Sequence, residues 1–311
     1  MMHKKPSKKR DVKYPVAFDL LNEELVDIGC LSEKNKSNII CPECSGRFIA
    51  VINHATPHFK HYGDFECLGT VESYIHKIVK ELLKKVSDFE LPELLIEDLP
   101  EEYLRNFWQM RSKLLDANIP LNQQREFING LKKNLTEVKK VIIDNVEIEK
   151  TIKTSKGDIR VDVVAHIGNK ILFIEPYYSN RINEDKKEKI RLTNIPTLSI
   201  SLKEFIMLVG FNFRLSDLKK WLFIDNSKNW IYLNDELYQK HINSYKEYLW
   251  SEIQKQKRRI ILNEIFLLKK ENVEKEKYLK DLKTKFKAVK SEISDALKQI
   301  DRLSKDLEDF K

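Results

Sequence analysis

Two apolar, β-branched segments separated by only two residues constrain this chain most strongly. The segments are Asp158–Ile167 and Lys170–Ser179, joined by Gly168-Asn169. Such runs around a Gly-Asn pair are typical of adjacent antiparallel strands in a hairpin. Each run contains one central acid, Asp162 or Glu175. Burying a carboxylate costs several kcal/mol unless it is paired or binds a cation, so two acids that converge at one end of neighbouring strands could share a divalent cation. Ordinary surface acids on strands are the alternative.

Composition limits the class of protein. The chain has 311 residues, of which 41% are hydrophobic and 33% charged, as expected of a soluble globular protein with a charge-rich helical part. No apolar run is long enough to cross a membrane, and the basic start Met1–Arg10 lacks the apolar region of a signal peptide, so we expect a cytoplasmic protein. The net charge of +8 favours a polyanionic partner such as DNA, although lysine-rich composition alone also produces it.

Cysteine and histidine residues gather in the first quarter of the chain. Cys41-Pro-Glu-Cys44 is a CxxC turn, and His58-Phe-Lys-His61 and Cys67 follow it. Zinc takes four nitrogen or sulfur ligands, and a CxxC turn presents two thiolates to one ion. In a cytosolic chain this clustering favours a metal site over disulfides.

We expect a structural Zn²⁺ held by Cys41, Cys44, His61 and Cys67, with His58 as the alternative fourth ligand. Four protein ligands leave no open position for substrate. Cys30 and His54 are expected to be bystanders. A reduced thiol cluster without metal is the other interpretation.

Hydrophobic periodicity predicts the remaining elements. The expected helices are 71–89, a helical insertion over 90–136 interrupted by three prolines, 184–191, and continuous helix from Ser244. The expected strands are 15–18, 24–28, 141–143, 146–152 and 196–200, followed by a hairpin of 221–225 with 230–233. Glu147 and Glu149 alternate with apolar residues and are expected to share one face.

Read in order, these motifs resemble the competence protein CoiA-like family. The resemblance rests first on the CPxC turn, the HF-x-H box and Cys67. It continues with Glu72-Ser73, His76 and Lys80 on one expected helix, and with Arg160-Val-Asp162-Val163. Glu175, Ser179-Asn180 and Lys186 match the positions that follow. The resemblance covers roughly residues 14–233.

The resemblance implies an α/β (α+β) fold, with a PD-(D/E)XK nuclease-like mixed sheet flanked by helices. It implies a zinc ribbon in 1–70 and a nuclease core in 71–243 with its insertion, and 244–311 follows as a helical segment. It further implies a Mg²⁺- or Mn²⁺-dependent endonuclease acting on DNA, in DNA uptake or defence against foreign DNA. Asp162 and Glu175 would bind the catalytic metal, and Lys186 would stabilise charge on the phosphate. Glu72 would face the metal and His76 the substrate.

Several departures keep other functions open. The expected E-x-K triplet reads Glu175-Pro176-Tyr177, the Thr-His pair reads Ser179-Asn180, and an acidic pair reads Ser199-Ile-Ser201. One alternative is a catalytically weakened DNA-binding subunit that recruits a partner through a C-terminal coiled coil. Another is a structural zinc protein whose strand acids are ordinary surface residues. Each site residue also has an interpretation without a functional role. Glu72 could simply stabilise the N-terminal end of its helix, and His76 and Lys80 could lie on a solvent-exposed face of that helix. Arg160 and Asp162 could form an ion pair with each other.

The C-terminal segment carries a heptad pattern. Leu279, Phe286, Ile293, Ile300 and Leu307 are seven residues apart, and Leu282, Val289, Ala296 and Leu303 occupy the second seam position. Charged residues fill most other positions, which favours a coiled coil over a fully buried helix. We expect a homo-oligomer or a partner protein on this seam, and a helix folding back within one chain is the alternative.

Overall fold

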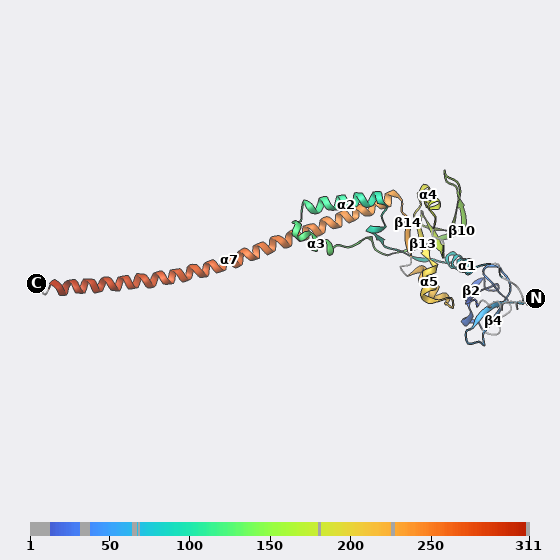
Figure 1. Ribbon diagram of the computed structural model, residues 1–311, viewed down its shortest axis with the longest axis horizontal. Coiled ribbons are helices and arrows are strands. Elements are labelled where there is room, and N and C mark those ends of the chain that lie inside the picture. Colours follow the sequence, from blue (N-terminus) through green and yellow to red (C-terminus); the bar gives the residue numbers. More distant parts are fainter. Residues whose placement is uncertain are drawn as a thin grey trace, which may run out of the picture. The chain divides into compact units, whose positions relative to one another are not determined.

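The chain forms a mixed α/β fold with several small sheets and a long C-terminal helix (Figure 1). The computed structural model describes residues 13–31, 38–63, 67, 69–179, 182–224 and 228–308. The described residues divide into two compact units. The first takes in Met1–Trp108 and Lys132–Tyr245, and the second takes in Gln109–Leu131 and Lys246–Lys311.

A five-stranded sheet organises the first unit. Its strand order is β10-β11-β12-β13-β14, and all neighbours are antiparallel except β12 and β13, which are parallel. The bounds are β10 Asn145–Ile152, β11 Ile159–Ile167, β12 Lys170–Tyr177, β13 Thr197–Ser201 and β14 Lys228–Tyr232. The predicted central hairpin is confirmed as β11 and β12, and Gly168 supplies the positive φ that its tight turn requires.

Both faces of this sheet are covered. Helix α1 (Val71–Lys84) packs against one face together with α5 (Leu202–Val209) and α6 (Leu215–Phe223). Helix α4 (Glu184–Thr193) covers the other face, where its Ile190 packs against Val161, Val164 and Phe173. Because the strands are buried on both sides, they read as nearly continuous apolar runs.

The N-terminal segment contains three strands of one sheet and a separate hairpin. The sheet has the order β2-β1-β3, with β1 Val16–Asp19, β2 Glu24–Asp27 and β3 Ile39–Ile40. The hairpin pairs β4 Phe48–Val51 with β5 His58–His61, and a 3₁₀ turn follows β2 at Ile28–Cys30. The buried side chains of this segment and of α1 belong to one hydrophobic core with the large sheet.

Tyr74 of α1 joins the N-terminal segment to the sheet. It is almost fully buried, its hydroxyl donates to the Val16 carbonyl oxygen at 2.5 Å, and it accepts from Val16 N at 3.1 Å. Two hydrogen bonds in the core fix the rotation of α1 about its own axis relative to β1. The other side of α1 carries His76 and Lys80.

The range between α1 and β10 mixes helices with short strands. Strands β6 (Asp88–Leu91) and β9 (Lys139–Ile142) pair, as do β7 (Leu94–Leu95) and β8 (Asn134–Thr136). Between them lie a 3₁₀ turn at Ile96–Asp98, α2 (Glu101–Asp116) and α3 (Leu121–Asn129). The predicted insertion is therefore only partly helical.

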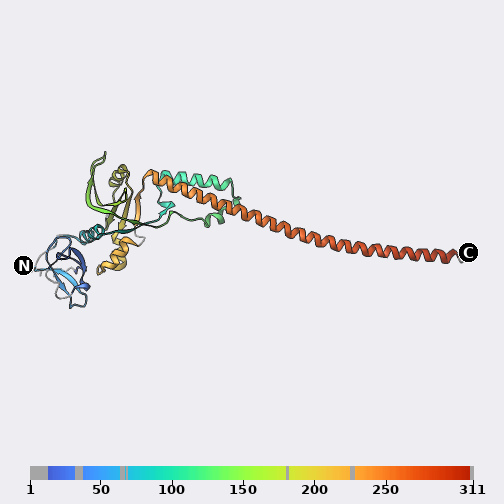
Figure 2. The same cartoon turned by 180° about the vertical axis from the view of Figure 1, so that it is seen from behind.

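Helix α7 runs from Asp235 to Glu308 and is continuous in both views (Figures 1 and 2). Tyr245, Leu249 and Ile253 near its start are buried, whereas the apolar residues from Ile261 to Leu297 are largely exposed. Among the described helices, none is long and apolar enough to cross a membrane.

Three sequence-based predictions of elements are corrected. The segment from Trp221 was expected to be a strand but completes helix α6, because Leu218 and Leu222 are buried one helical turn apart; Asp225 lies outside the described residues. The helix expected to reach Phe89 ends at Lys84, since Phe89 pairs with Val141 in a strand.

The long helix begins before Ser244. It starts at Asp235, where the Asn234 side chain accepts a hydrogen bond from Leu237 N at 2.9 Å and so satisfies one of the exposed amides of the first turn.

Candidate functional site

The predicted cysteine and histidine ligands converge. The ligand atoms of Cys41, Cys44, His61 and Cys67 all lie within 4.8 Å of one another, and Cys44 Sγ is 3.3 Å from His61 Nε2. In a tetrahedral zinc site with Zn–S bonds of about 2.3 Å, two sulfur atoms lie roughly 3.8 Å apart. The donor set and its spacing therefore fit a structural metal such as zinc.

Local backbone geometry aims the sulfur atoms inward. Burial raises the pKa of the Cys41 thiol to about 12 and also raises the pKa of Cys67. Amide groups of Cys44 and Glu43 bond to the Cys41 thiol and oppose this effect, and the Gly69 amide does the same for Cys67. Without a cation the Cys41 thiol would stay protonated, so metal binding must displace a proton.

The structure distinguishes between the two histidines. His58 lies three residues before His61 on β5, so their side chains point to opposite faces of the strand. Its Nδ1 lies 2.8 Å from the Thr56 carbonyl oxygen, and it is not part of the ligand cluster. Cys30 is exposed and also lies outside the cluster. The ligand set with His61 is the one that the fold brings together.

Asp162 and Glu175 lie where two strands separate. Strands β11 and β12 pair from Ile167 and Lys170 to Val163 and Ile174. Beyond that point β11 continues against β10, while β12 continues against β13. Asp162 and Glu175 are the first residues past the last pair, at the base of a fork between the two strands.

The two acids of the fork are in contact. The Asp162 amide donates to Glu175 Oε1 at 3.4 Å. The Lys186 ammonium, from the first turn of α4, donates to Glu175 Oε2 at 2.6 Å. Glu175 is buried, while Asp162 and Lys186 are partly exposed. The fold thus assembles three of the predicted site residues from β11, β12 and α4.

Burial dominates the acidity of Glu175. It raises the pKa of this carboxyl to about 7, and the nearby Asp162 carboxylate acts in the same direction. The Lys186 ammonium opposes both effects and lowers the pKa. Near neutral pH the site therefore holds a carboxyl group that can either keep a proton or release it to bind a cation.

Lys80 connects Asp162 with a third acid. Its ammonium lies 2.7 Å from Asp162 Oδ1 and 2.9 Å from Glu149 Oε1. Glu149 also pairs with Arg160. The Lys80 contact is the largest cause of a Glu149 pKa of about 2. The alternative interpretation, an ion pair between Arg160 and Asp162, is not what the structure shows, since Arg160 pairs with Glu149 and Asp162 with Lys80.

A backbone irregularity turns Glu149 toward the fork. The β10–β11 register passes from Ile148–Val163 to Lys150–Val161 without pairing Glu149, whose φ is +54°. The register is the same on both sides of Glu149, so no extra residue is inserted, but the left-handed backbone at this unpaired position interrupts the alternation of side chains. Glu147 instead contacts His166 and Lys150. The expectation that Glu147 and Glu149 share a face fails because of this irregularity.

The residues predicted on α1 lie beside the fork. Glu72 accepts hydrogen bonds from Ser179 Oγ at 2.7 Å and Ser179 N at 3.4 Å, so this carboxylate faces the end of β12. Asn180 lies outside the described residues. Burial lowers the pKa of His76, and the next largest influence is the Asp162 carboxylate, which raises it. His76 is thus predominantly neutral at pH 7 and close enough to Asp162 to sense its charge.

The fork offers fewer convergent ligands than the cysteine cluster. Within the described residues, the cysteine and histidine set is the only group of three or more such side chains whose ligand atoms lie within 4.8 Å. A divalent cation at the fork would therefore take its protein ligands mainly from Asp162 and Glu175, with water completing the shell. Mg²⁺ commonly binds through one or two carboxylates in this way.

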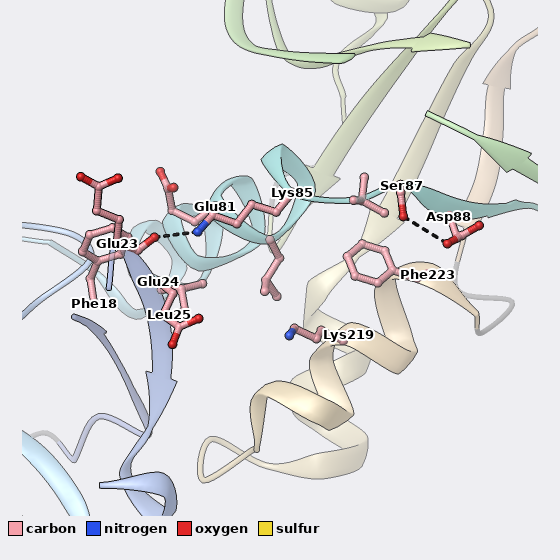
Figure 3. Close-up of a pocket in the computed structure, with 12 residues that line it drawn as sticks. Phe18, Glu23, Glu24, Leu25, Glu81, Lys85, Ser87, Asp88, Lys219 and Phe223 are labelled. Atoms are coloured by element: carbon pink, nitrogen blue, oxygen red, sulfur yellow. Dashed lines mark hydrogen bonds between the residues drawn. The ribbon is translucent and has the colours of Figure 1, made fainter. Parts of the chain in front are cut away.

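A separate pocket of about 310 Å³ opens between β2, the end of α1 and α6 (Figure 3). Acids and lysines surround an apolar floor there. Lys85 Nζ donates to the Glu23 carbonyl oxygen at 2.6 Å, and Ser87 Oγ donates to Asp88 at 3.1 Å. These polar groups partly satisfy one another, and none of the predicted site residues lies in this pocket.

Comparison with models of known protein families, with curated proteins and with solved structures gave no match.

Proposed function

We propose that this protein is a metal-dependent nuclease acting on DNA phosphodiester bonds, with a structural zinc in its N-terminal segment. The observation that carries the proposal is the strand fork, where a buried carboxyl, a second acid and a lysine from another element meet. The positive net charge supports a polyanionic substrate. DNA uptake and defence against foreign DNA are the processes that the sequence resemblance suggests.

Each residue has a distinct role in this proposal. Asp162 and Glu175 would hold Mg²⁺ or Mn²⁺, which when bound polarises a phosphate and lowers the pKa of bound water. Glu175 must lose its proton to bind a cation, and its pKa of about 7 places that change near neutral pH. Lys186 would place a positive charge beside the reacting phosphate.

His76 and Glu72 would act at the edge of the fork. A neutral imidazole can accept a proton from water or donate a hydrogen bond to a phosphate oxygen. Glu72 holds Ser179 by two hydrogen bonds, which fixes the end of β12 next to Glu175. We assign it a positioning role in the proposed reaction.

Cleavage of plasmid and linear DNA with Mg²⁺ or Mn²⁺ tests the proposal. Asp162→Ala should reduce the rate at least 10³-fold, whereas Lys186→Ala should reduce it on the order of 10²-fold. Lys186→Ala should leave metal affinity largely unchanged, because an ammonium is not a ligand. Glu188→Gln is the control, since Glu188 lies on α4 and pairs with Lys156 at the surface. Equal rates for the native protein and Asp162→Ala would overturn the assignment.

A second candidate is a DNA-binding subunit without strong activity. Both acids of the fork already contact a lysine ammonium, and Pro176 and Tyr177 follow Glu175 where the related pattern has lysine. This candidate predicts DNA binding that survives Asp162→Ala, with no cleavage by either protein.

We further propose that α7 associates with a second copy of the chain. Its apolar seam is exposed, with 72% of Phe286 and 57% of Ile293 accessible to solvent. The side chains of Ile300, Leu303 and Leu307 lie outside the described residues. Exposed a and d positions repeated over several heptads are the usual basis of a coiled coil.

Sedimentation tests this association. The full chain should sediment as an oligomer, and a chain ending at Lys270 should be a monomer that keeps the buried Tyr245 and Leu249 contacts. Monomers in both cases would remove the proposal.

A further inference from the structure

A pocket of about 430 Å³ lies over the α4 face of the large sheet. Tyr177, Ser199, Asn229 and Trp230 line it from the strands, and Lys187 and Arg191 line it from α4. Its volume falls within the range of about 300 to 1,000 Å³ typical of small-ligand sites. Lys187 pairs with Glu184 on the same helix at 2.7 Å, and none of the six side chains has a part in the carboxylate contacts at the fork described above.

Strand register places this pocket next to the fork. Glu175 is aligned with Ser199 on β13, and Ser199 is aligned with Asn229 on β14. Neighbouring strands lie about 4.8 Å apart, so the row from Glu175 to Asn229 covers roughly 10 Å. Tyr177 is two residues after Glu175 on the same strand, so the two side chains point to the same face of the sheet. The pocket begins where the proposed cleavage site ends.

The lining combines three chemistries. Tyr177 supplies aromatic surface, Lys187 and Arg191 supply positive charge, and Ser199 and Asn229 supply neutral hydrogen-bonding groups. Trp230 contributes less to the lining, because its side chain packs in the core on the α1 face and its Nε1 donates to the Pro92 carbonyl oxygen at 3.2 Å. Aromatic side chains beside a cationic track are the usual means of holding unstacked bases and their phosphates. The one acid in the lining, Asp98, already accepts a hydrogen bond from Leu95 N at 3.1 Å.

We propose that this pocket holds an unpaired nucleotide of single-stranded DNA, with its base against the Tyr177 ring and its phosphate at Lys187 and Arg191. A base within a duplex cannot present its face to a pocket unless it leaves the stack, which costs free energy. The protein should therefore prefer single-stranded DNA over duplex DNA. The link to cleavage rests on the proposed nuclease function, but the binding preference does not.

Binding is measured by fluorescence anisotropy with a labelled oligothymidylate and a blunt duplex of the same length. The buffer contains no added divalent cation and no chelator, so the zinc site is kept and cleavage does not interfere. We expect the single strand to bind at least tenfold more tightly than the duplex.

Substitutions in the pocket identify the aromatic contribution. Tyr177→Ala should weaken single-strand binding on the order of tenfold, whereas Tyr177→Phe should bind like the native protein, because the ring is retained. Circular dichroism and melting temperature show whether each variant is folded. A folded Tyr177→Ala variant with native affinity would overturn the assignment of the pocket.

The cationic contribution has a matched control on the same helix. Arg191→Gln and Lys187→Gln should each weaken binding and lower the salt dependence by roughly 0.7 per cation lost. Lys189→Gln removes the same charge from α4, but Lys189 pairs with Asp185 and approaches Gly157 at the loop between β10 and β11. Lys189→Gln should retain native affinity.

Each outcome decides one of the two claims. Stronger single-strand binding that falls in Arg191→Gln but not in Lys189→Gln supports the pocket, even if no DNA is cleaved. Equal affinity for single strand and duplex, or equal effects of the Arg191 and Lys189 substitutions, overturns it. Absence of cleavage with intact single-strand binding contradicts the nuclease proposal alone.

Discussion

The cysteine and histidine cluster and the strand fork both bring ionisable groups close together, and they differ in where the compensating positive charge comes from. In the cluster, four donor atoms converge within 4.8 Å, and three belong to thiols. At the fork, Lys80 contacts Asp162 and Lys186 contacts Glu175. The first arrangement needs an external cation to ionise its thiols, whereas the second carries its own positive charges.

The difference indicates how each site depends on metal. A cluster that must release thiol protons to bind metal gains folding stability from that metal. A fork balanced by lysines can fold without a divalent cation, and a cation would then compete with ammonium groups already in place. Zinc at the cluster should therefore affect stability, whereas under the proposed nuclease function magnesium at the fork would affect the reaction rate.

The largest expected effect is loss of the cluster. Cys44→Ser should reduce zinc well below one ion per chain and lower the melting temperature by roughly 10 °C or more, because structural zinc contributes several kcal/mol to folding. Cys30→Ser is the control, since Cys30 is exposed and outside the cluster. Elemental analysis with calorimetry measures both quantities. If Cys44→Ser keeps the zinc content and stability of the native protein, the cluster does not depend on metal and the proposed difference between the two sites is wrong.

Glu175→Gln should change how stability depends on pH. The folded pKa of about 7 lies above the ordinary value of 4.5, so the protonated form stabilises the fold below pH 4.5 and this stability is lost as pH rises through 7. That loss amounts to about 3 kcal/mol. Glutamine cannot ionise, so the variant should be more stable than the native protein at pH 8.

Urea unfolding at pH 5 and pH 8, without added divalent cations, measures this effect. Glu188→Gln, at the surface of α4, should leave the pH dependence as in the native protein. Parallel pH profiles for Glu175→Gln and the native protein would show that Lys186 already neutralises Glu175 fully.

Lys80→Met should have the smallest effect. It leaves Asp162 and Glu149 without their shared ammonium and should destabilise the fold by about 2 kcal/mol at low ionic strength. Millimolar Mg²⁺ should restore part of this loss by neutralising the same acids. Lys77→Met, at an exposed position of the same helix, is the control. A loss unaffected by Mg²⁺ would argue that the fork does not take a divalent cation.

The parts of the fold that follow simple periodicity were predictable from the sequence. The hairpin of β11 and β12 follows from two apolar runs around Gly168-Asn169, and the ligand cluster follows from the CxxC turn with its neighbouring histidine and cysteine. In both cases the interacting residues are close in sequence, so local patterns contain most of the information.

Features that depend on distant residues were not predictable in this way. The apolar segment from Trp221 has the pattern of a strand, but it forms the end of helix α6, because a helix buries Leu218 and Leu222 together against the core. Alternation predicts that Glu149 shares a face with Glu147, but the left-handed backbone at Glu149 turns its side chain toward Lys80, which is 69 positions away in the sequence. No local pattern indicates which residue of a strand will adopt this conformation.

Helix α1 has a consequence for how this chain can be divided. Its Tyr74 is anchored to Val16 in the N-terminal segment, while its His76 and Lys80 lie beside the fork. We therefore expect that cutting the chain at residue 70, or exchanging the segment that carries the cysteine and histidine cluster, disturbs the position of α1 at the fork. Any chimera that transplants this segment should carry α1 with it, and sequence changes in the two regions should be inherited together.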